Sequence, residues 1–294
     1  MKRAYRLPRN FKPETRELLS KILAVTESYQ QQGYVLTLRQ LYYQLVVQNI
    51  FANQQKNYAK LSDLLGEARI CGLCDWDVIE DRIRIPKFPN EWVNINTAME
   101  TLIVVYRRQR WSDQNNYVEV WVEKDALSGV LEPITHEYHV HLLVNRGYSS
   151  ISAMHDSAKR FLYAENQSKD CHLLYFGDHD PSGEDMVRDI IKRLQEFRAS
   201  VEVEKIALTR EQVDENHLPP NPAKTTDPRA RGYIEQHGDE SWELDALPPK
   251  VLNELLRDAL ENLVDRERYD SQIEQEEADK ETMKSFGEEH GGKE

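Results

Sequence analysis

Between residues 117 and 208 the sequence alternates short apolar segments of strand-like composition with longer segments of helical periodicity, and this alternation constrains the fold more than any other feature. The apolar segments are rich in Val, Leu and aromatic residues, as in strands that are covered on both faces. Parallel strands require a long connection between them, and a helix usually provides it. The strand-like segments are 117–124, 141–147, 171–178 and 201–208. The pattern predicts an α/β domain with a Rossmann-like parallel sheet over residues 115–208.

The preceding part of the chain has a different pattern, with three short helices followed by a small β element. Apolar residues recur at helical spacing in 14–32, and Thr37 and Gln40 then form a capping box that predicts the start of a second helix. After the third helix, the sequence WDVIEDRIRI is prone to form strands. This order predicts an α+β winged-helix domain over residues 1–96, joined to the α/β domain by a linking helix within 97–114.

Beyond residue 208 the periodicity weakens into a stretch rich in Pro and polar residues, followed by one amphipathic helix. We expect residues 209–264 to form an extension that packs on the α/β domain. Residues 265–294 are acidic and nearly free of large apolar side chains. This composition predicts a flexible tail or a frayed helix.

The net charge of −13 over 294 residues is unevenly distributed. Residues 1–110 contain 17 Lys and Arg against 11 Asp and Glu, a net charge of +6, whereas the remainder contains 21 against 40, a net charge of −19. A basic N-terminal third joined to a carboxylate-rich remainder is compatible with binding of double-stranded DNA. The basic residues predicted to contact the DNA backbone are Arg3, Arg6, Arg9, Lys12 and Lys124.

The composition also indicates a location. No apolar run approaches membrane-spanning length, and the basic N-terminus lacks the apolar segment of a signal peptide. Three cysteines do not make a disulfide framework. We therefore expect a cytoplasmic protein that has no membrane partner.

Carboxylates follow two of the expected strands at the edge where parallel sheets carry their functional residues. Glu123 ends the first strand, and Asp178 and Asp180 end the third. Three converging carboxylates suit Mg²⁺, for which Mn²⁺ could substitute. The alternative is that Asp178 and Asp180 are turn residues and a helix N-cap. Farther along, Glu243 and Asp245 are either a further acidic part of this site or residues of an exposed strand face.

The segments VEVWVEK, LLVNRGYSS and YFGDHDPSGEDM resemble, in that order, the motifs of a Toprim domain. Within them, VEKDA and DHDPSG resemble the Toprim sequences of the topoisomerase VI A subunit and its relative, the meiotic double-strand-break transesterase. The chain resembles a short stand-alone member of that family. The matching residues are Glu123, Gly147, Asp178, Asp180 and Gly183. The resemblance implies that the acids hold Mg²⁺ beside the scissile phosphate of DNA, with Glu123 both a metal ligand and a catalytic residue.

The same family carries a nucleophilic tyrosine in a motif like R-x-x-Y-Y within its winged-helix domain. The sequence TLRQLYY places Arg39 and Tyr43 at the matching positions. On a helical wheel Tyr43 faces away from the apolar stripe and lies one turn after Arg39, whereas Tyr42 belongs to the stripe. We therefore expect a solvent-facing phenol beside a guanidinium, which could help it ionise and could hold a phosphate. The alternative is a surface tyrosine in a cation–π contact with the arginine.

The resemblance implies a reaction, a homodimer and a further partner. In the family, the tyrosine of one protomer meets the metal of the other, and a separate ATPase partner drives strand passage. We expect DNA cleavage by tyrosine transesterification. Two alternatives remain open: a hydrolytic Toprim nuclease of a defence or mobile-element system, which would not use Tyr43, and a non-catalytic DNA-binding subunit.

Overall fold

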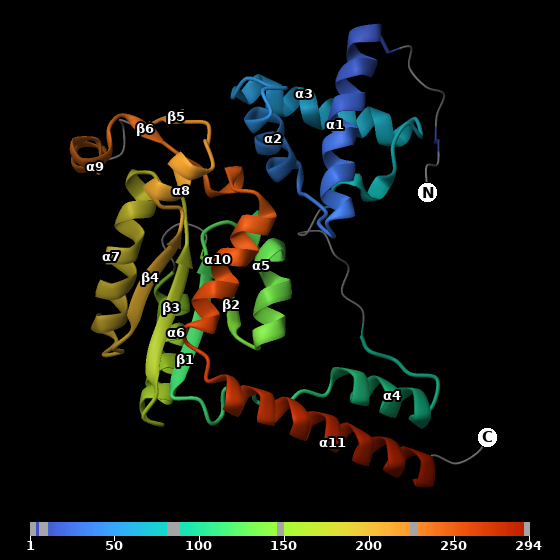
Figure 1. Ribbon diagram of the computed structural model, residues 1–294, viewed down its shortest axis with the longest axis vertical. Coiled ribbons are helices and arrows are strands. Elements are labelled where there is room, and N and C mark those ends of the chain that lie inside the picture. Colours follow the sequence, from blue (N-terminus) through green and yellow to red (C-terminus); the bar gives the residue numbers. More distant parts are fainter. Residues whose placement is uncertain (1–3, 6–10, 81–88, 146–149, 224–228, 291–294) are drawn as a thin grey trace.

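The computed structural model describes residues 4–5, 11–80, 89–145, 150–223 and 229–290 (Figure 1). At its centre lies a parallel four-stranded sheet in the order β2-β1-β3-β4. The strands are β1 (Asn116–Val122), β2 (His141–Val144), β3 (Asp170–Phe176) and β4 (Glu202–Ala207). The predicted α/β domain with a parallel, Rossmann-like sheet is thus confirmed at the level of its architecture.

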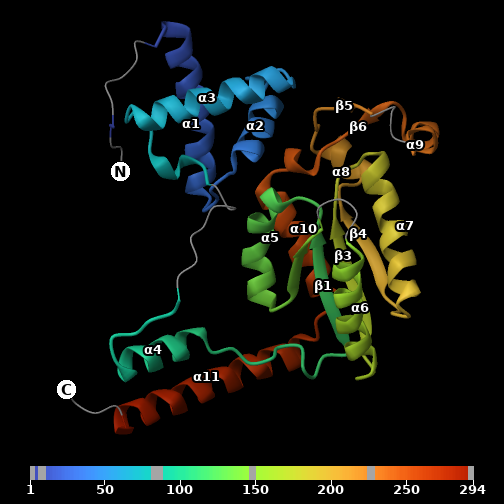
Figure 2. The same cartoon turned by 180° about the vertical axis from the view of Figure 1, so that it is seen from behind.

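Helices cover both faces of the sheet (Figures 1 and 2). Val120 and Val122 of β1 pack in the same core as the helices of one face, whereas Trp121 packs on the other face. This alternation follows from the two-residue period of a strand. One face carries α5 (Asp125–Tyr138) and α10 (Pro249–Glu261), and the other carries α6 (Ile151–Glu165) and α7 (Pro181–Glu196).

The strand order creates a switch point between β1 and β3. The chain leaves β1 toward α5 on one face and leaves β3 toward α7 on the other face. The carboxyl ends of these two neighbouring strands therefore border an open crevice, which is where ligands bind in sheets of this kind. Glu123 and Asp178 lie one and two residues beyond those strand ends.

The N-terminal part consists of α1 (Pro13–Gln31), α2 (Leu38–Val47) and α3 (Gln55–Ile70), packed around a common apolar core. The predicted capping box at the start of α2 is present. The predicted winged helix is not confirmed, because Trp76–Val78 forms a 3₁₀ helix, η1, instead of a strand. Glu80 makes a single bridge with Thr37, and residues 81–88, where the rest of the wing was expected, lie outside the described residues.

The segment after β4 packs on the sheet and also reaches the N-terminal helices. It contains α8 (Arg210–Glu215), β5 (Asn221–Pro222), α9 (Ala230–His237), β6 (Glu240–Ser241), η2 (Leu244–Ala246) and α10. Helix α10 packs against α5 and β4, and η2 packs against α2. The N-terminal helices and the far C-terminal segment thus meet beside the carboxyl edge of the sheet.

The linking segment and the end of the chain form a helical pair that extends away from the sheet (Figures 1 and 2). Its helices are α4 (Ile95–Val105) and α11 (Arg266–His290), which pack against each other. Of the two alternatives for the acidic end of the chain, a helix is present over Arg266–His290, and Tyr269 and Glu276 are buried against preceding parts of the chain. In the described ranges, no helix combines the length and the apolar character needed to cross a membrane.

Candidate active site

A cavity of about 270 Å³ opens where the N-terminal helices meet the carboxyl edge of the sheet. It brings together Tyr43 of α2, Asp178 and Asp180 after β3, and Glu243 from the C-terminal segment. The predicted tyrosine and two of the predicted acids therefore border one space within a single chain. The resemblance had implied that the tyrosine of one protomer lies beside the acids of another. In this structure Tyr43 lies beside the acids of its own chain.

A backbone bridge between His179 and Trp242 determines which carboxylates lie beside Asp178. The amide of His179 donates to the carbonyl of Trp242, and the amide of Trp242 donates back to His179, each at 2.9 Å. This pairing places Glu243 and the following turn beside Asp178. The amide of Leu244 then donates to Asp178 Oδ1 at 2.8 Å.

Three carboxylates converge as a result, namely those of Asp178, Glu243 and Asp245, with ligand oxygens all within 4.8 Å of one another. Only Asp178 belongs to the predicted metal set of Glu123, Asp178 and Asp180. Asp245 is 1% exposed and lies in η2, so the alternative of an exposed strand face is wrong for this residue. The alternating acids of WELDAL were the sequence signal for this cluster.

Two cations lie among these acids. The ammonium of Lys124 is 2.6 Å from Asp178 Oδ1, 2.8 Å from Asp245 Oδ2 and in close contact with Glu243. Arg39 donates to Glu243 at 2.7 Å and lies 3.3 Å from Asp245. Lys124 was predicted to contact the DNA backbone, but its ammonium is directed into the acidic cluster.

The charges explain the titration behaviour of the cluster. Burial opposes ionisation of Lys124, but Asp245, Asp178 and Glu243 outweigh it and hold the lysine pKa well above its ordinary value. Burial likewise disfavours ionised Glu243, but Lys124 and Arg39 lower its pKa to about 2. Two cations cannot fully balance three carboxylates. Burial and the neighbouring acids accordingly raise the pKa of Asp178 to about 7, against the opposing charge of Lys124.

Glu123 and Asp180 support the edge of this cluster. Glu123 Oε2 accepts a hydrogen bond from the amide of Asp178 at 3.1 Å. Asp180 is the N-cap of α7, and its Oδ1 accepts from the amide of Gly183 at 2.6 Å. The N-cap alternative therefore holds for Asp180, whose side chain also borders the cavity.

The residue between the two aspartates anchors the loop. His179 is 2% exposed, and its Nδ1 pairs with Glu184 at 2.7 Å. Its ring packs against those of Tyr233 and Trp242. Lys205 donates to the carbonyl of Asp178 at 2.8 Å and to Glu184 at 2.6 Å. These contacts hold the strand-end loop in one conformation, so that Asp178 is directed toward the acidic cluster.

Tyr43 differs from its prediction. It is 8% exposed and not solvent-facing, because η2 covers the side of α2 that a wheel of the isolated helix leaves open. The Arg39 guanidinium lies 5.8 Å from the Tyr43 ring centroid, so the expected neighbour is present. Burial and the charge of Glu243 raise the pKa of the Tyr43 phenol above its ordinary value, against the effects of Arg39 and Lys124. Tyr42 is in the core as predicted.

The predicted DNA contacts in the N-terminal arm are only partly described. Lys12 is exposed at the start of α1. Arg3, Arg6 and Arg9 lie outside the described residues, as does Gly147 of the second matching motif. Comparison with protein-family models, with curated proteins and with solved structures finds no match.

Proposed function

We propose that this protein cleaves DNA in a Mg²⁺-dependent reaction at the cavity between α2 and the carboxyl edge of the sheet. The observation that carries the proposal is that Tyr43 borders the same cavity as Asp178, Asp180 and Glu243. A phenol and an acidic cluster are the two parts that tyrosine transesterification requires. We propose DNA as the substrate because the motifs resemble those of Toprim enzymes, which act on DNA.

The donor set fits a divalent cation. Carboxylate oxygens are the ligands that Mg²⁺ prefers, and those of Asp178, Glu243 and Asp245 lie close enough to share one ion. Both carboxylate oxygens of Asp245 are buried, and within the described structure only the ion pairs with Lys124 and Arg39 offset their charge. A bound cation would offset the charge that raises the Tyr43 pKa and would stabilise negative charge developing on the phosphate.

The chain's own residues then have defined roles in the preferred route. The Tyr43 oxygen, after losing its proton, attacks the phosphorus, and the bond from phosphorus to the 3′ oxygen breaks. The 3′ oxygen leaves as an alkoxide and takes up a proton, so the products are a 5′-phosphotyrosyl bond and a 3′ hydroxyl. Arg39 lies beside both Tyr43 and Glu243 and can pair with a phosphate oxygen. The homodimer and the separate ATPase partner belong to this proposal through the resemblance alone.

Hydrolysis is the second candidate, and a specific observation favours it. Tyr43 is largely covered, and its pKa is raised, so the phenol ionises less readily than a free tyrosine. Water activated at the same acidic cluster would then be the nucleophile, and Tyr43 would be dispensable.

Plasmid cleavage with Mg²⁺ or Mn²⁺, stopped with detergent and assayed for protein bound covalently to DNA ends, tests the proposal. Wild type is compared with Tyr43→Phe and Asp178→Asn. Tyr58→Phe serves as the matched tyrosine control, since Tyr58 lies in the same helical unit but does not border the cavity. Asp189→Asn in α7 serves as the matched acid control.

The expected result is covalent ends with wild type and with both controls, and their loss in Tyr43→Phe and Asp178→Asn. Removal of a nucleophile or of a metal ligand lowers cleavage by at least about a thousandfold. Free ends that persist in Tyr43→Phe and vanish in Asp178→Asn would replace transesterification with hydrolysis. Cleavage that survives Asp178→Asn would contradict both routes.

A further inference from the structure

A second and larger cavity, of about 620 Å³, lies at the opposite edge of the sheet. It is bordered by the segment 107–112 before β1, by the starts of β1 and β2, and by the C-terminal half of α6. Its charged lining residues are Arg107, Arg108, Arg110, Lys159, Arg160 and Lys169. No Asp or Glu is among the described residues that line it, although the chain as a whole carries a net charge of −13.

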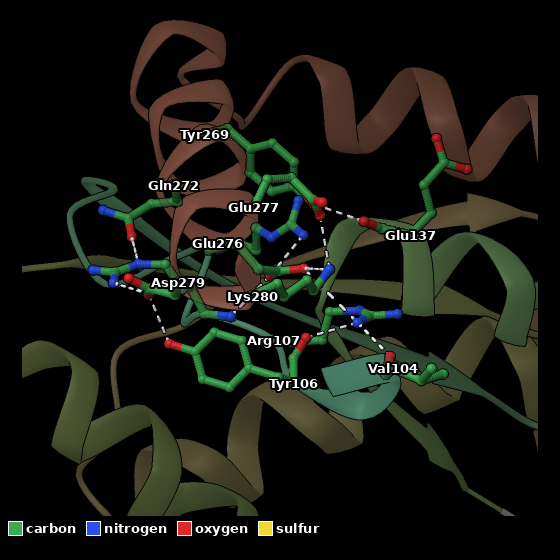
Figure 3. Close-up of polar contacts among 12 residues, drawn as sticks. Val104, Tyr106, Arg107, Glu137, Tyr269, Gln272, Glu276, Glu277, Asp279 and Lys280 are labelled. Carbon is green, nitrogen blue, oxygen red and sulfur yellow. Dashed lines mark hydrogen bonds and ion pairs between the residues drawn. The ribbon is translucent and has the colours of Figure 1, made fainter. Parts of the chain in front are cut away.

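The acids behind this cavity do not fully balance its cations. Glu276 of α11 is shared by Arg110 at 2.8 Å, Lys280 at 2.8 Å and Arg107 at 3.8 Å (Figure 3). Lys280 also pairs with Glu277 at 2.8 Å, so Glu276 is the carboxylate that Arg110 and Arg107 share. Three other lining cations have carboxylates of their own: Arg108 pairs with Asp279 at 2.7 Å, Arg160 with Glu119 at 2.6 Å and Lys159 with Asp156 at 3.1 Å. Helix α11 therefore holds the basic segment in place and leaves positive charge at the cavity.

Two of the lining cations could each accept a further interaction with an anion. Arg110 is 8% exposed, and its Nε has no hydrogen-bond partner in the described structure. A buried guanidinium N–H without an acceptor is costly. Lys169 donates only to the backbone carbonyls of Trp111 and Ser112, and no carboxylate of the described chain lies within ion-pair distance of it. Both groups would gain from an anion in the cavity.

The α6 wall adds an aromatic surface to these charges. Lys159, Tyr163 and Gln167 follow one another at four-residue spacing and border the cavity together with Arg160. The spacing places Lys159 and Tyr163 on one face of α6, and Gln167 follows in the turn just beyond the end of the helix. Tyr163 is 70% exposed, which is unusual for a large aromatic ring. An exposed ring beside cations is the arrangement on which nucleic-acid bases stack.

We propose that this cavity binds a nucleoside phosphate, with the phosphate near Arg110 and Lys169 and the base against Tyr163. Its volume is within the range of about 300–1,000 Å³ that small-ligand sites occupy. Guanidinium and ammonium groups without competing carboxylates in the lining suit a phosphate. The ligand is either a free nucleotide or a nucleotide unit of a DNA strand, and the phosphate and base chemistry is common to both. The site is separate from the acidic cavity at the other edge of the sheet.

Isothermal titration calorimetry in EDTA, with no divalent cation present, tests this site. The probes are deoxyadenosine monophosphate and a short single-stranded oligonucleotide. Lys169→Gln is expected to weaken binding about tenfold, the loss of one charge-assisted hydrogen bond. Tyr163→Ala removes an exposed ring without disturbing the core, and we expect binding to weaken by about fivefold or more.

Lys192→Gln is the matched control, because it makes the same charge change on an exposed part of α7 outside the cavity. Because no divalent cation is present and neither cavity variant changes the acidic cluster, the result is independent of the proposed cleavage chemistry. Binding of the mononucleotide supports a free nucleotide as the ligand, and binding of the oligonucleotide alone supports a DNA strand. Absence of binding by wild type, or equal weakening by Lys192→Gln and the cavity variants, would overturn the proposal.

Discussion

Gly183 shows how one residue holds the acidic cluster in place. A Cβ atom built at this position would lie 2.1 Å from the backbone oxygen of Asp178, well inside van der Waals contact. The first turn of α7 can approach the strand-end loop only because the side chain is absent. The glycine amide also donates to Asp180, so the close approach and the helix cap depend on the same residue.

Gly183→Ala is expected to lower the free energy of unfolding by about 1–3 kcal/mol, because α7 must move away from Asp178. Urea unfolding followed by circular dichroism measures the change. Gly66→Ala is the matched control, since a Cβ there meets nothing within 4 Å and Gly66 lies inside α3. That control is expected to be stabilised by about 0.5–1 kcal/mol. Equal effects at both positions would refute the close-approach argument.

Among the elements, α11 differs most from what its composition suggested. It is polar nearly all round, and such a helix is stable only when specific contacts hold it. Those contacts are the buried Glu276 with its cations and Tyr269, whose hydroxyl donates to the carbonyl of Glu137 at 2.6 Å (Figure 3). Burial opposes ionisation of Glu276, but hydrogen bonds from Lys280 and from the Arg108 amide outweigh it, and Arg110 adds to them. The pKa of Glu276 is thereby lowered to about 2.

Glu276→Gln is expected to lower the free energy of opening of α11 by about 3 kcal/mol at pH 7, since it leaves the buried Arg110 guanidinium without a carboxylate partner. Because the folded pKa is below the ordinary value of 4.5, the stabilisation is complete above pH 5 and is lost as pH falls from 4.5 toward 2. Amide hydrogen exchange of α11 at pH 7 and at pH 3, corrected for intrinsic rates, measures both effects.

Glu274→Gln, an exposed change on the same helix, is the control and is expected to have little effect. If it opens the helix as much as Glu276→Gln, or if the difference between wild type and Glu276→Gln is the same at both pH values, the buried ion pair does not hold α11.

For the whole molecule, the acidic cavity exists because two distant parts of the chain meet. Arg39 and Glu243 are 204 positions apart in sequence. The contact is continued by Gln44, which donates to the carbonyl of Ala246 at 3.3 Å. The helical N-terminal part therefore contributes both Tyr43 and one of the two cations that offset the acidic cluster.

Arg39→Gln is expected to tighten Mg²⁺ binding about tenfold, because the cluster loses a competing cation and gains net negative charge. The same variant is expected to cleave DNA more slowly, since Tyr43 and the phosphate lose their neighbouring guanidinium. Calorimetric titration with Mg²⁺, without DNA, measures the first effect. Arg16→Gln on the exposed side of α1 is the charge-matched control. Weaker Mg²⁺ binding in Arg39→Gln than in Arg16→Gln would place the metal elsewhere.

Local patterns determined much of this protein in advance. The alternation of apolar strands and amphipathic helices predicts the parallel sheet, because strand and helix periods are properties of the backbone. Carboxylates directly after two such strands predict an acidic edge, because parallel strands end together. The cap of α2 could also be predicted, since a capping box joins residues three positions apart.

Tertiary packing decided the rest. The wheel of α2 shows which side of that helix is apolar, but only the packing of η2 buries Tyr43. Lys124 could extend to solvent, and it turns inward because Asp178, Glu243 and Asp245 converge on it. The convergence depends on a backbone bridge between His179 and Trp242, which are distant in sequence. Local sequence determines which elements form, whereas contacts between distant elements determine which side chains are buried and which charges meet.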